Sequence, residues 1–149
     1  MGFGDRNFWS LHVFCDVSQH AYATVIVLRC ETNEENLVSF VAARSRVAPL
    51  KGITIPRLEL MACVLGVRLS KYVTQALALD GIPKYFWTDS TTAISWIASS
   101  DAWGTFVGNR VTEICVFSKA DQWSYVPSPS NPADLPSRGC SPLQFSESD

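Results

Sequence analysis

The chain has 149 residues, of which 47% are hydrophobic and 17% are charged, a composition typical of one folded domain and not of a disordered chain. No apolar run approaches the roughly 18–20 residues of a membrane span, so we expect no membrane partner. The net charge of −2 argues against a protein that is basic throughout, but residues 40–71 hold six basic residues and one acid, a local charge of +5 that would suit a phosphodiester.

The first half of the chain predicts a short antiparallel meander. Residues 1–8 form a lead-in without the basic-then-apolar pattern of a secretory signal, so we expect an intracellular protein. Runs rich in β-branched and aromatic residues predict strands at residues 9–16, 22–30 and 37–45. Their short connections favour antiparallel pairing.

The second half predicts alternating helices and strands. Helices are expected at residues 56–79, 90–98 and 105–117, and strands at 84–88 and 122–126. The first helix would begin at Pro56 and end before Gly81. A short terminal helix would follow, with Asn131 as its cap and Pro132 in its first turn. The prediction is one α/β domain at residues 9–141, followed by a disordered tail at 142–149. Its sheet would be mixed and five-stranded, with three antiparallel strands and then two parallel strands, flanked by helices.

The five cysteines are odd in number, widely spaced and without a CxxC pair. They predict free buried thiols in a reducing compartment, and no zinc site.

Four carboxylates occupy positions at the edges of these core elements. Asp16 closes the run LHVFCD, Asp89 closes YFWTD, Asp134 lies in NPAD, and Glu59 stands near the start of the most apolar helix. A buried carboxylate costs several kcal/mol unless a cation neutralises it. Taken singly, these acids are also explained as turn residues or as helix-start acids. Together they predict a shared site for Mg²⁺ or Mn²⁺ at the carboxyl ends of parallel strands.

Five sequence blocks occur in an order that resembles a known family. The chain resembles the ribonuclease H domain of BEL/Pao-type long-terminal-repeat retrotransposon polyproteins over about residues 10–140. The blocks are FCDVSQHAYA, VAARSRVAPLKGITIPRLELMACVLGVRL, YFWTDSTTAISWI, FVGNRVTEI and NPADLPSRG. The chain departs from the family pattern at Val17 and Ala23, and it has no histidine before the terminal helix.

The resemblance implies hydrolysis of the RNA strand of an RNA–DNA hybrid during reverse transcription. The family's metal-binding acids match Asp16, Glu59, Asp89 and Asp134. Two Mg²⁺ ions, for which Mn²⁺ would substitute, would lie about 4 Å apart at the scissile phosphate. Asp16 would bridge them, because it lies on the expected central strand. An adjoining reverse transcriptase domain of the same polyprotein is the implied partner. A cytoplasmic retroelement particle, or the nucleus, is the implied location.

Contacts with the hybrid are predicted from basic and hydroxyl side chains near these acids. The candidates are Arg44, Ser45, Arg46, Lys51, Arg57, Ser90, Thr91, Asn109 and Arg110.

Three alternatives to this enzyme were considered. An integrase or transposase core is disfavoured by a glutamate on the first long helix. An aspartic peptidase is disfavoured because the chain lacks Asp-Thr-Gly and Asp-Ser-Gly. A captured, non-catalytic domain that binds nucleic acid or a polymerase remains open. The five tryptophans are expected to pack in the core or at its edge rather than to stack on bases.

Overall fold

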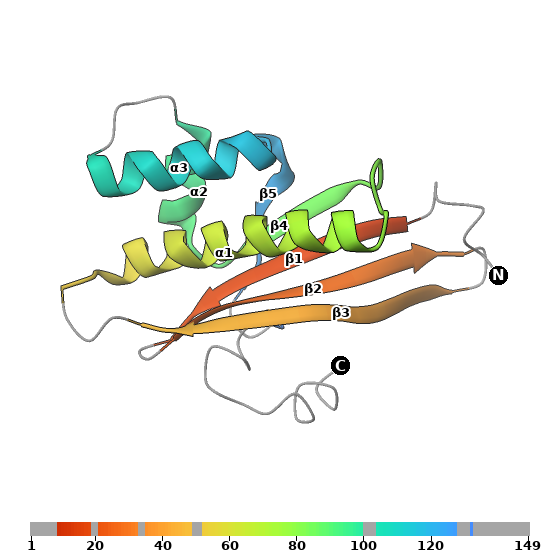
Figure 1. The fold of residues 1–149 in the computed structure, drawn as a ribbon. Coiled ribbons are helices and arrows are strands. Elements are labelled where there is room, and N and C mark those ends of the chain that lie inside the picture. The colour runs from red at the N-terminus through yellow and green to blue at the C-terminus, as the bar shows by residue number, and fades with distance from the viewer. Residues whose placement is uncertain are drawn as a thin grey trace.

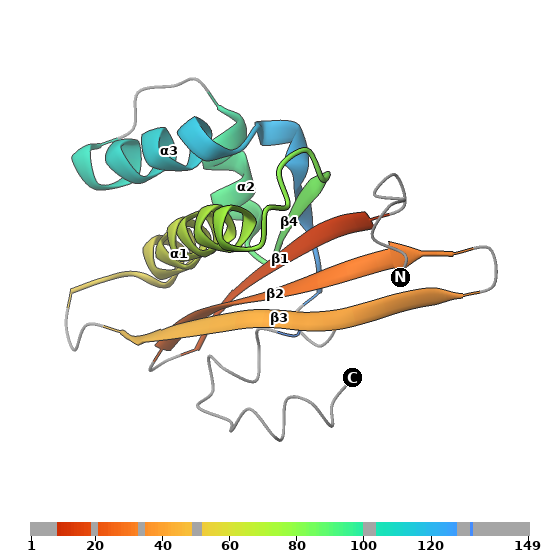
Figure 2. The ribbon, with the colours of Figure 1, turned by 45° about the vertical axis from the view of Figure 1, so that its right-hand side comes forward.

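The computed structural model describes residues 9–18, 21–32, 35–48, 52–99, 104–127 and 132. Within these residues a five-stranded sheet has the strand order β3-β2-β1-β4-β5, and three α-helices lie on one of its faces (Figures 1 and 2). The predicted mixed sheet is therefore confirmed, with β1 as its central strand. No described helix is long and apolar enough to span a membrane.

The first three strands form the predicted antiparallel meander. They are β1 (Trp9–Val17), β2 (Ala21–Glu31) and β3 (Asn36–Val47). The pairing of β2 with β3 shifts by one residue between Ile26 and Val27, as at a β-bulge. The carboxyl end of β1 thus lies in the middle of the sheet, next to the start of β2.

Helix α1 (Ile55–Ala76) begins as predicted but ends three residues early. Thr54 caps its N-terminus and Pro56 lies in its first turn. The predicted end at residue 79 is wrong because Ala78 adopts a left-handed conformation, with φ of 53°. Hydrogen bonds from Ala78 N to Gln75 O and from Leu79 N to Thr74 O close a Schellman motif. The sequence favoured Gly81 as the terminator, and that glycine instead occupies the following turn, with φ of 87°.

The later strands lie parallel to β1, as predicted. Strand β4 (Lys84–Thr88) pairs with β1, and β5 (Trp123–Tyr125) pairs with β4. Helix α2 (Thr91–Ala98) is capped by Ser90, and helix α3 (Thr105–Phe117) has the predicted bounds. The last strand is shorter than predicted by one residue at each end. Gln122 belongs to a preceding 3₁₀ turn, Ala120–Gln122, and Val126 follows the strand. The predicted lead-in and tail lie outside the described residues, and of the predicted terminal helix only Pro132 is described, in a turn.

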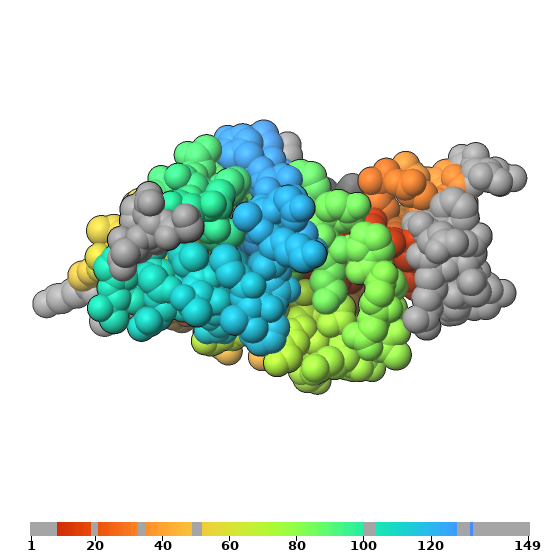
Figure 3. Space-filling view, turned by 90° about the horizontal axis from the view of Figure 1, so that it is seen from above, coloured from red at the N-terminus to blue at the C-terminus, as the bar shows by residue number. Residues whose placement is uncertain are grey.

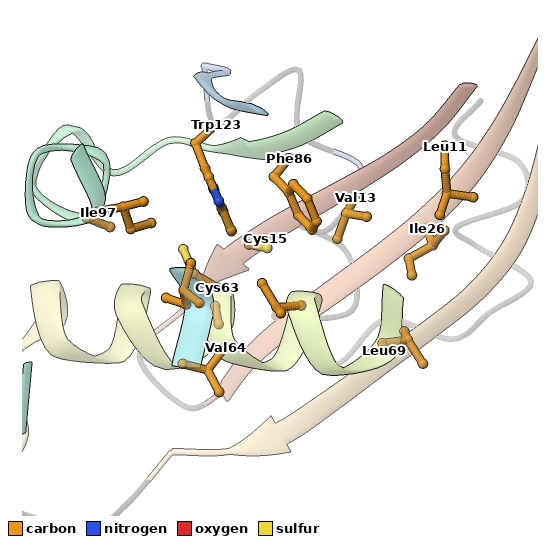
Figure 4. Packing of buried hydrophobic residues seen from close by; sticks show 14 of the residues in the cluster. Leu11, Val13, Cys15, Ile26, Cys63, Val64, Leu69, Phe86, Ile97 and Trp123 are labelled. Carbon is orange, nitrogen blue, oxygen red and sulfur yellow. The ribbon is translucent and has the colours of Figure 1, made fainter. Parts of the chain in front are cut away.

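The core lies between the sheet and the three helices (Figure 4). Alternate residues of β1 face it, and Leu11, Val13 and Cys15 are fully buried. Phe86 and Trp123 stack there with ring centroids 4.7 Å apart. Seen from the helix side, α3 lies over the N-terminal part of α1 (Figure 3). Helix α1 is therefore held between the sheet and α3.

The opposite face of the sheet carries a smaller aromatic cluster. His12 stacks on Tyr85 and Trp87, with ring centroids 5.2 Å and 6.1 Å away. The indole of Trp87 donates a hydrogen bond of 3.1 Å to His12 Nδ1. Burial, reinforced by the charge of Arg29, lowers the pKa of His12. The role predicted for tryptophans in packing is confirmed for Trp9 and Trp123, which are buried.

Candidate active site and nucleic-acid interface

Two of the predicted acids lie at the carboxyl ends of neighbouring parallel strands, Asp16 as the second-last residue of β1 and Asp89 directly after β4. The pairing of β1 with β4 sets Cys15 beside Thr88, so Asp16 and Asp89 come next at the same edge of the sheet. Asp16 is only 3% exposed, and its Oδ1 accepts a hydrogen bond of 2.8 Å from the Val17 amide. Asp89 is half-buried, and its Oδ1 has no hydrogen-bond partner among the described residues. A buried, unsatisfied carboxylate oxygen is costly without a ligand.

Glu59, in the second turn of α1, is close to the second of these acids. Burial raises the pKa of Glu59, and the negative charge of Asp89 raises it further. A hydrogen bond with the Ser90 side chain opposes this rise. The structure thus brings Glu59, Asp89 and Ser90 together, while Asp16 ends the adjacent strand.

Helix α1 packs closely against the sheet, and this packing allows Glu59 to lie near the strand ends that carry the two aspartates. A Cβ atom added at Gly66 would lie 2.7 Å from Cys15 Sγ and 3.1 Å from Thr24 Oγ1. The same side of α1 carries Cys63, and burial raises the pKa of its thiol well above the ordinary value. The described cysteines are free, as predicted, but only Cys15 and Cys63 are buried. The prediction of burial is wrong for Cys115, which is exposed, and Cys30 is only partly buried. Cys140 lies outside the described residues.

The donor set fits a hard divalent cation in its chemistry. Asp16, Glu59 and Asp89 offer carboxylate oxygens, which Mg²⁺ and Mn²⁺ prefer. The unsatisfied Oδ1 of Asp89 and the raised pKa of Glu59 both indicate negative charge that the described side chains leave uncompensated. Within the described part of the chain, no three His, Cys, Asp or Glu side chains already form a metal-binding group. The fourth predicted ligand, Asp134, lies outside it.

Four of the predicted substrate contacts lie together around one groove, whose lining includes none of the predicted metal-binding acids. We call it the arginine groove; it has a volume of about 570 Å³ and runs between β3, α1 and α3. The four predicted residues in its lining are Arg44, Arg46, Asn109 and Arg110. Sequence reasoning did not assign Arg68 or Tyr72 to the substrate, although both line the groove. The signal for Arg68 was its place in the basic stretch of residues 40–71.

The remaining predicted contacts are placed differently. Ser45 alternates with Arg44 and Arg46 along β3, so its side chain projects from the other face of the sheet. Arg57 lies over the Phe106 ring at 5.1 Å, on the side of α1 that faces α3. Lys51 lies outside the described residues.

The two predicted hydroxyl contacts, Ser90 just before α2 and Thr91 at its first position, differ in how far they are buried. Ser90 is 4% exposed, and its Oγ accepts a hydrogen bond of 3.0 Å from the Ala93 amide as the helix cap. Its hydroxyl therefore serves α2 and Glu59 locally, whereas Thr91 is exposed.

Comparison with known proteins agrees with this fold. The family model described as Pao retrotransposon-like RNaseH-like domain matches residues 3–90, more than half of the chain. No curated protein sequence matches significantly.

Solved structures with this fold include bacterial and archaeal ribonucleases H. The chain is similar to the N-terminal RNase H domain of Rv2228c from Mycobacterium tuberculosis, with a TM-score of 0.58, 12% identity, and coverage of 93% of this chain and 97% of that one. It is also similar to LC11-RNase H1 in complex with an RNA/DNA hybrid, with a TM-score of 0.54 and 10% identity. RNase H1 from Halobacterium salinarum has a TM-score of 0.50 and 11% identity. Each of the latter two comparisons covers 85% of this chain and 91% of the other.

These structural likenesses establish the fold, and the sequence match establishes the family. The chain belongs to the Pao retrotransposon-like RNaseH-like domain family.

Proposed function

We propose that this domain is a metal-dependent endonuclease that hydrolyses the RNA strand of RNA–DNA hybrids during retroelement reverse transcription. The observation that carries the proposal is the meeting of Glu59 with Asp89 and Ser90 beside the strand end that holds Asp16. Acids at the carboxyl ends of adjacent parallel strands are well placed for ligand chemistry. Family membership and the ribonuclease H fold support the same activity.

Asp16, Glu59, Asp89 and Asp134 would hold two Mg²⁺ ions, for which Mn²⁺ would substitute. When bound, such ions supply a water of lowered pKa and stabilise the charge that develops on the scissile phosphate and the leaving oxygen. The protein's own contribution is a set of carboxylate oxygens carried by α1 and by the carboxyl ends of β1 and β4. Asp16 is held by the Val17 amide, and Glu59 is oriented by Ser90. Ser90 is itself fixed as the cap of α2, so it acts as a positioning residue.

The raised pKa of Glu59 has a direct consequence for the site. Two neighbouring carboxylates repel each other when both are ionised, and burial increases that cost. A divalent cation would remove this repulsion and favour the ionised form of Glu59. Cation binding should therefore favour loss of the Glu59 proton.

The hybrid would be held through its backbone rather than through its bases. Arg44, Arg46 and Arg110 supply guanidinium groups suited to phosphate oxygens. Recognition of the RNA strand would rest on groove shape and on 2′-hydroxyl groups. A reverse transcriptase domain of the same polyprotein would supply further contacts with the hybrid.

The test is cleavage of an end-labelled RNA–DNA hybrid in Mg²⁺, with the wild type beside Asp89→Asn. We expect cleavage of the hybrid alone, with single-stranded RNA and double-stranded DNA left intact. Removing one carboxylate of a metal site forfeits several kcal/mol, so the variant should be slower by more than about a hundredfold. A matched control, Asp80→Asn, removes an exposed acid in the turn after α1 and should leave the rate unchanged.

A different outcome would favour the second candidate, a non-catalytic domain that binds nucleic acid. Folded wild-type protein that binds the hybrid but does not cut it in either Mg²⁺ or Mn²⁺ would contradict the nuclease proposal. The arginine groove is compatible with this second candidate as well, because none of the predicted metal-binding acids lines it and it would bind a phosphate backbone without cleavage.

A further inference from the structure

We propose that the arginine groove is a second anchoring site, which binds the phosphate backbone of the hybrid beyond the point of cleavage. We also infer that Glu113 limits the affinity of this site by holding one of its arginines. The proposal deepens the proposed function and rests on it for the identity of the polyanion.

The groove lies on a different side of α1 from the acidic site. Met61, Leu65, Arg68 and Tyr72 recur every three or four residues, so they share one face of the helix. Glu59, which contacts Ser90, belongs to the sheet-facing side together with Gly66. Helix α1 therefore separates the two regions, between α3 on one side and the sheet on the other (Figure 2).

The far end of the groove is too distant from the acids for one phosphate group to contact both. Tyr72 is thirteen residues after Glu59, which corresponds to about 20 Å along the helix at a rise of about 1.5 Å per residue. That length spans roughly six base-pair steps of a duplex strand at about 3.4 Å per step. The groove begins near the acids, because its lining includes Met61, two residues after Glu59, and Tyr22, which pairs with Val17. A hybrid seated at the acids would need to continue along α1 to reach the far end of the groove at Tyr72.

The charge of the groove suits a phosphate backbone. Four arginines and one glutamate line it, which leaves a local charge of +3 in a protein whose net charge is −2. They are Arg44, Arg46, Arg68, Arg110 and Glu113. Arginine binds phosphate oxygens through two parallel N–H groups, which favours a phosphate ligand over an apolar one.

Aromatic side chains hold two of these guanidinium groups in place. Arg44 lies over the Tyr72 ring, 6.0 Å from its centroid, and Arg110 lies over the Phe106 ring at 4.0 Å. A guanidinium that is stacked in this way loses less conformational freedom when it binds. The groove is thus partly organised before a ligand arrives.

Arg68 differs from the other three because it is paired across the groove. Its Nη2 donates to Glu113 Oε1 at 2.8 Å, and its Nε donates to the other carboxylate oxygen. The Arg68 side chain is nevertheless 64% exposed. A phosphate in the groove must compete with Glu113 for this guanidinium, so the acid should weaken binding.

The experiment measures binding of a fluorescent RNA–DNA hybrid of roughly 20 base pairs by anisotropy, in EDTA and at several salt concentrations. This duplex is long enough to reach both regions at about 3.4 Å per base pair. Arg44→Ala/Arg46→Ala should bind on the order of tenfold more weakly, and its slope of log affinity against log salt should fall by about two. Glu113→Gln should bind about two- to threefold more tightly, because it frees Arg68 and removes a negative charge.

A charge-matched control separates the groove from the net charge of the protein. Arg29→Ala/Lys119→Ala removes the same two charges elsewhere, and Arg29 lies seven residues along β2 from the groove residue Tyr22. This control should retain wild-type affinity and salt dependence. Circular dichroism and thermal unfolding would verify that each variant is folded.

Several results would overturn the groove proposal without touching the nuclease. Equal affinities and salt slopes for wild type and Arg44→Ala/Arg46→Ala would do so. Failure of the wild type to bind the hybrid at all would contradict both proposals. If the same substitutions weakened binding of an acidic peptide but not of the hybrid, the groove would be assigned to a protein partner instead. Failure of the nuclease proposal is recognised separately, as absence of cleavage when the hybrid is bound.

Discussion

The acidic site and the arginine groove are built on the same helix but by opposite means. At the acidic site, carboxylates are buried or half-buried, and α1 approaches the sheet so closely that only Gly66 fits between them. In the groove, arginines at the surface are held by aromatic rings and by Glu113. The first region stores unfavourable charge that a cation would relieve, whereas the second presents charge that solvent already screens. Substitutions should therefore affect stability at the acidic site more than in the groove.

The largest expected effect on stability comes from Gly66→Ala. Its new methyl group would press on Cys15 Sγ, and overpacking of this kind costs about 1–3 kcal/mol. The better helix propensity of alanine offsets up to about 1 kcal/mol. We expect a net loss of about 1–2 kcal/mol by urea denaturation, and a loss of cleavage rate that exceeds the loss of hybrid affinity, because Glu59 moves with the helix.

The control is the double variant Cys15→Ala/Gly66→Ala, which removes the clashing sulfur. The coupling free energy from the double-mutant cycle should be favourable by roughly 1 kcal/mol. Additive effects would mean that the helix does not press on Cys15, and that the acidic site does not depend on this approach.

A smaller effect, of the opposite sign, is expected for Glu59→Gln. Since the pKa of Glu59 is raised by burial and by Asp89, its ionised form destabilises the native state. The cost is absent below the pKa in the unfolded chain, grows as the pH rises towards the folded pKa, and is constant above it. Solvent screens a half-buried group, so the variant should gain only about 0.5–1 kcal/mol at pH 7 without metal.

Thermal unfolding with and without Mg²⁺ measures this gain. The wild type should be stabilised by the cation, and Glu59→Gln should respond less. Helix α1 contains no acid other than Glu59. Glu113→Gln on α3 therefore serves as the comparison, and it should keep the full response to Mg²⁺. A variant that is less stable than the wild type without metal would contradict the idea of stored charge.

The smallest effect is expected for the Arg68–Glu113 ion pair. The hydrogen bonds from Arg68 lower the pKa of Glu113, so the pair stabilises the protein above the unfolded pKa of the acid. This contribution is lost as the pH falls through the lowered folded pKa. A double-mutant cycle of Arg68→Gln and Glu113→Gln should give about 0.5 kcal/mol at pH 7 and nearly zero at about pH 2. A coupling that persists in acid would show that packing, and not charge, joins the two residues.

Much of the fold followed from local signals in the sequence. The alternating and β-branched runs predicted all five strands, and the bounds of residues 84–88 and 105–117 agree with the structure. The predicted end of α1 was wrong because the sequence indicated Gly81 as the helix terminator, whereas the chain turns at Ala78. A left-handed alanine carries no local signal, and the Schellman hydrogen bonds that hold it there form only in the folded chain.

The residues of the candidate site also fall into two groups: those that local sequence signals identified, and those whose role only the structure revealed. Asp16, Glu59 and Asp89 were identified from charges placed beside apolar runs, and the parallel pairing of β1 with β4 puts the two aspartates at one edge. Ser90 was assigned to the substrate, but the structure uses it to cap α2 and to contact Glu59. Period-two alternation along β3 places the Ser45 side chain on the opposite face of the sheet from Arg44 and Arg46.

The sequence by itself determined the strands, the helices and the acids, because each depends on residues that are near one another in the chain. Only the tertiary structure decided that Arg68 meets Glu113, forty-five residues away, and that β3, α1 and α3 enclose a groove. It also decided that Gly66 is where the helix touches the sheet. Contacts of this kind depend on how elements pack against one another, and packing is set by the whole core rather than by any local pattern.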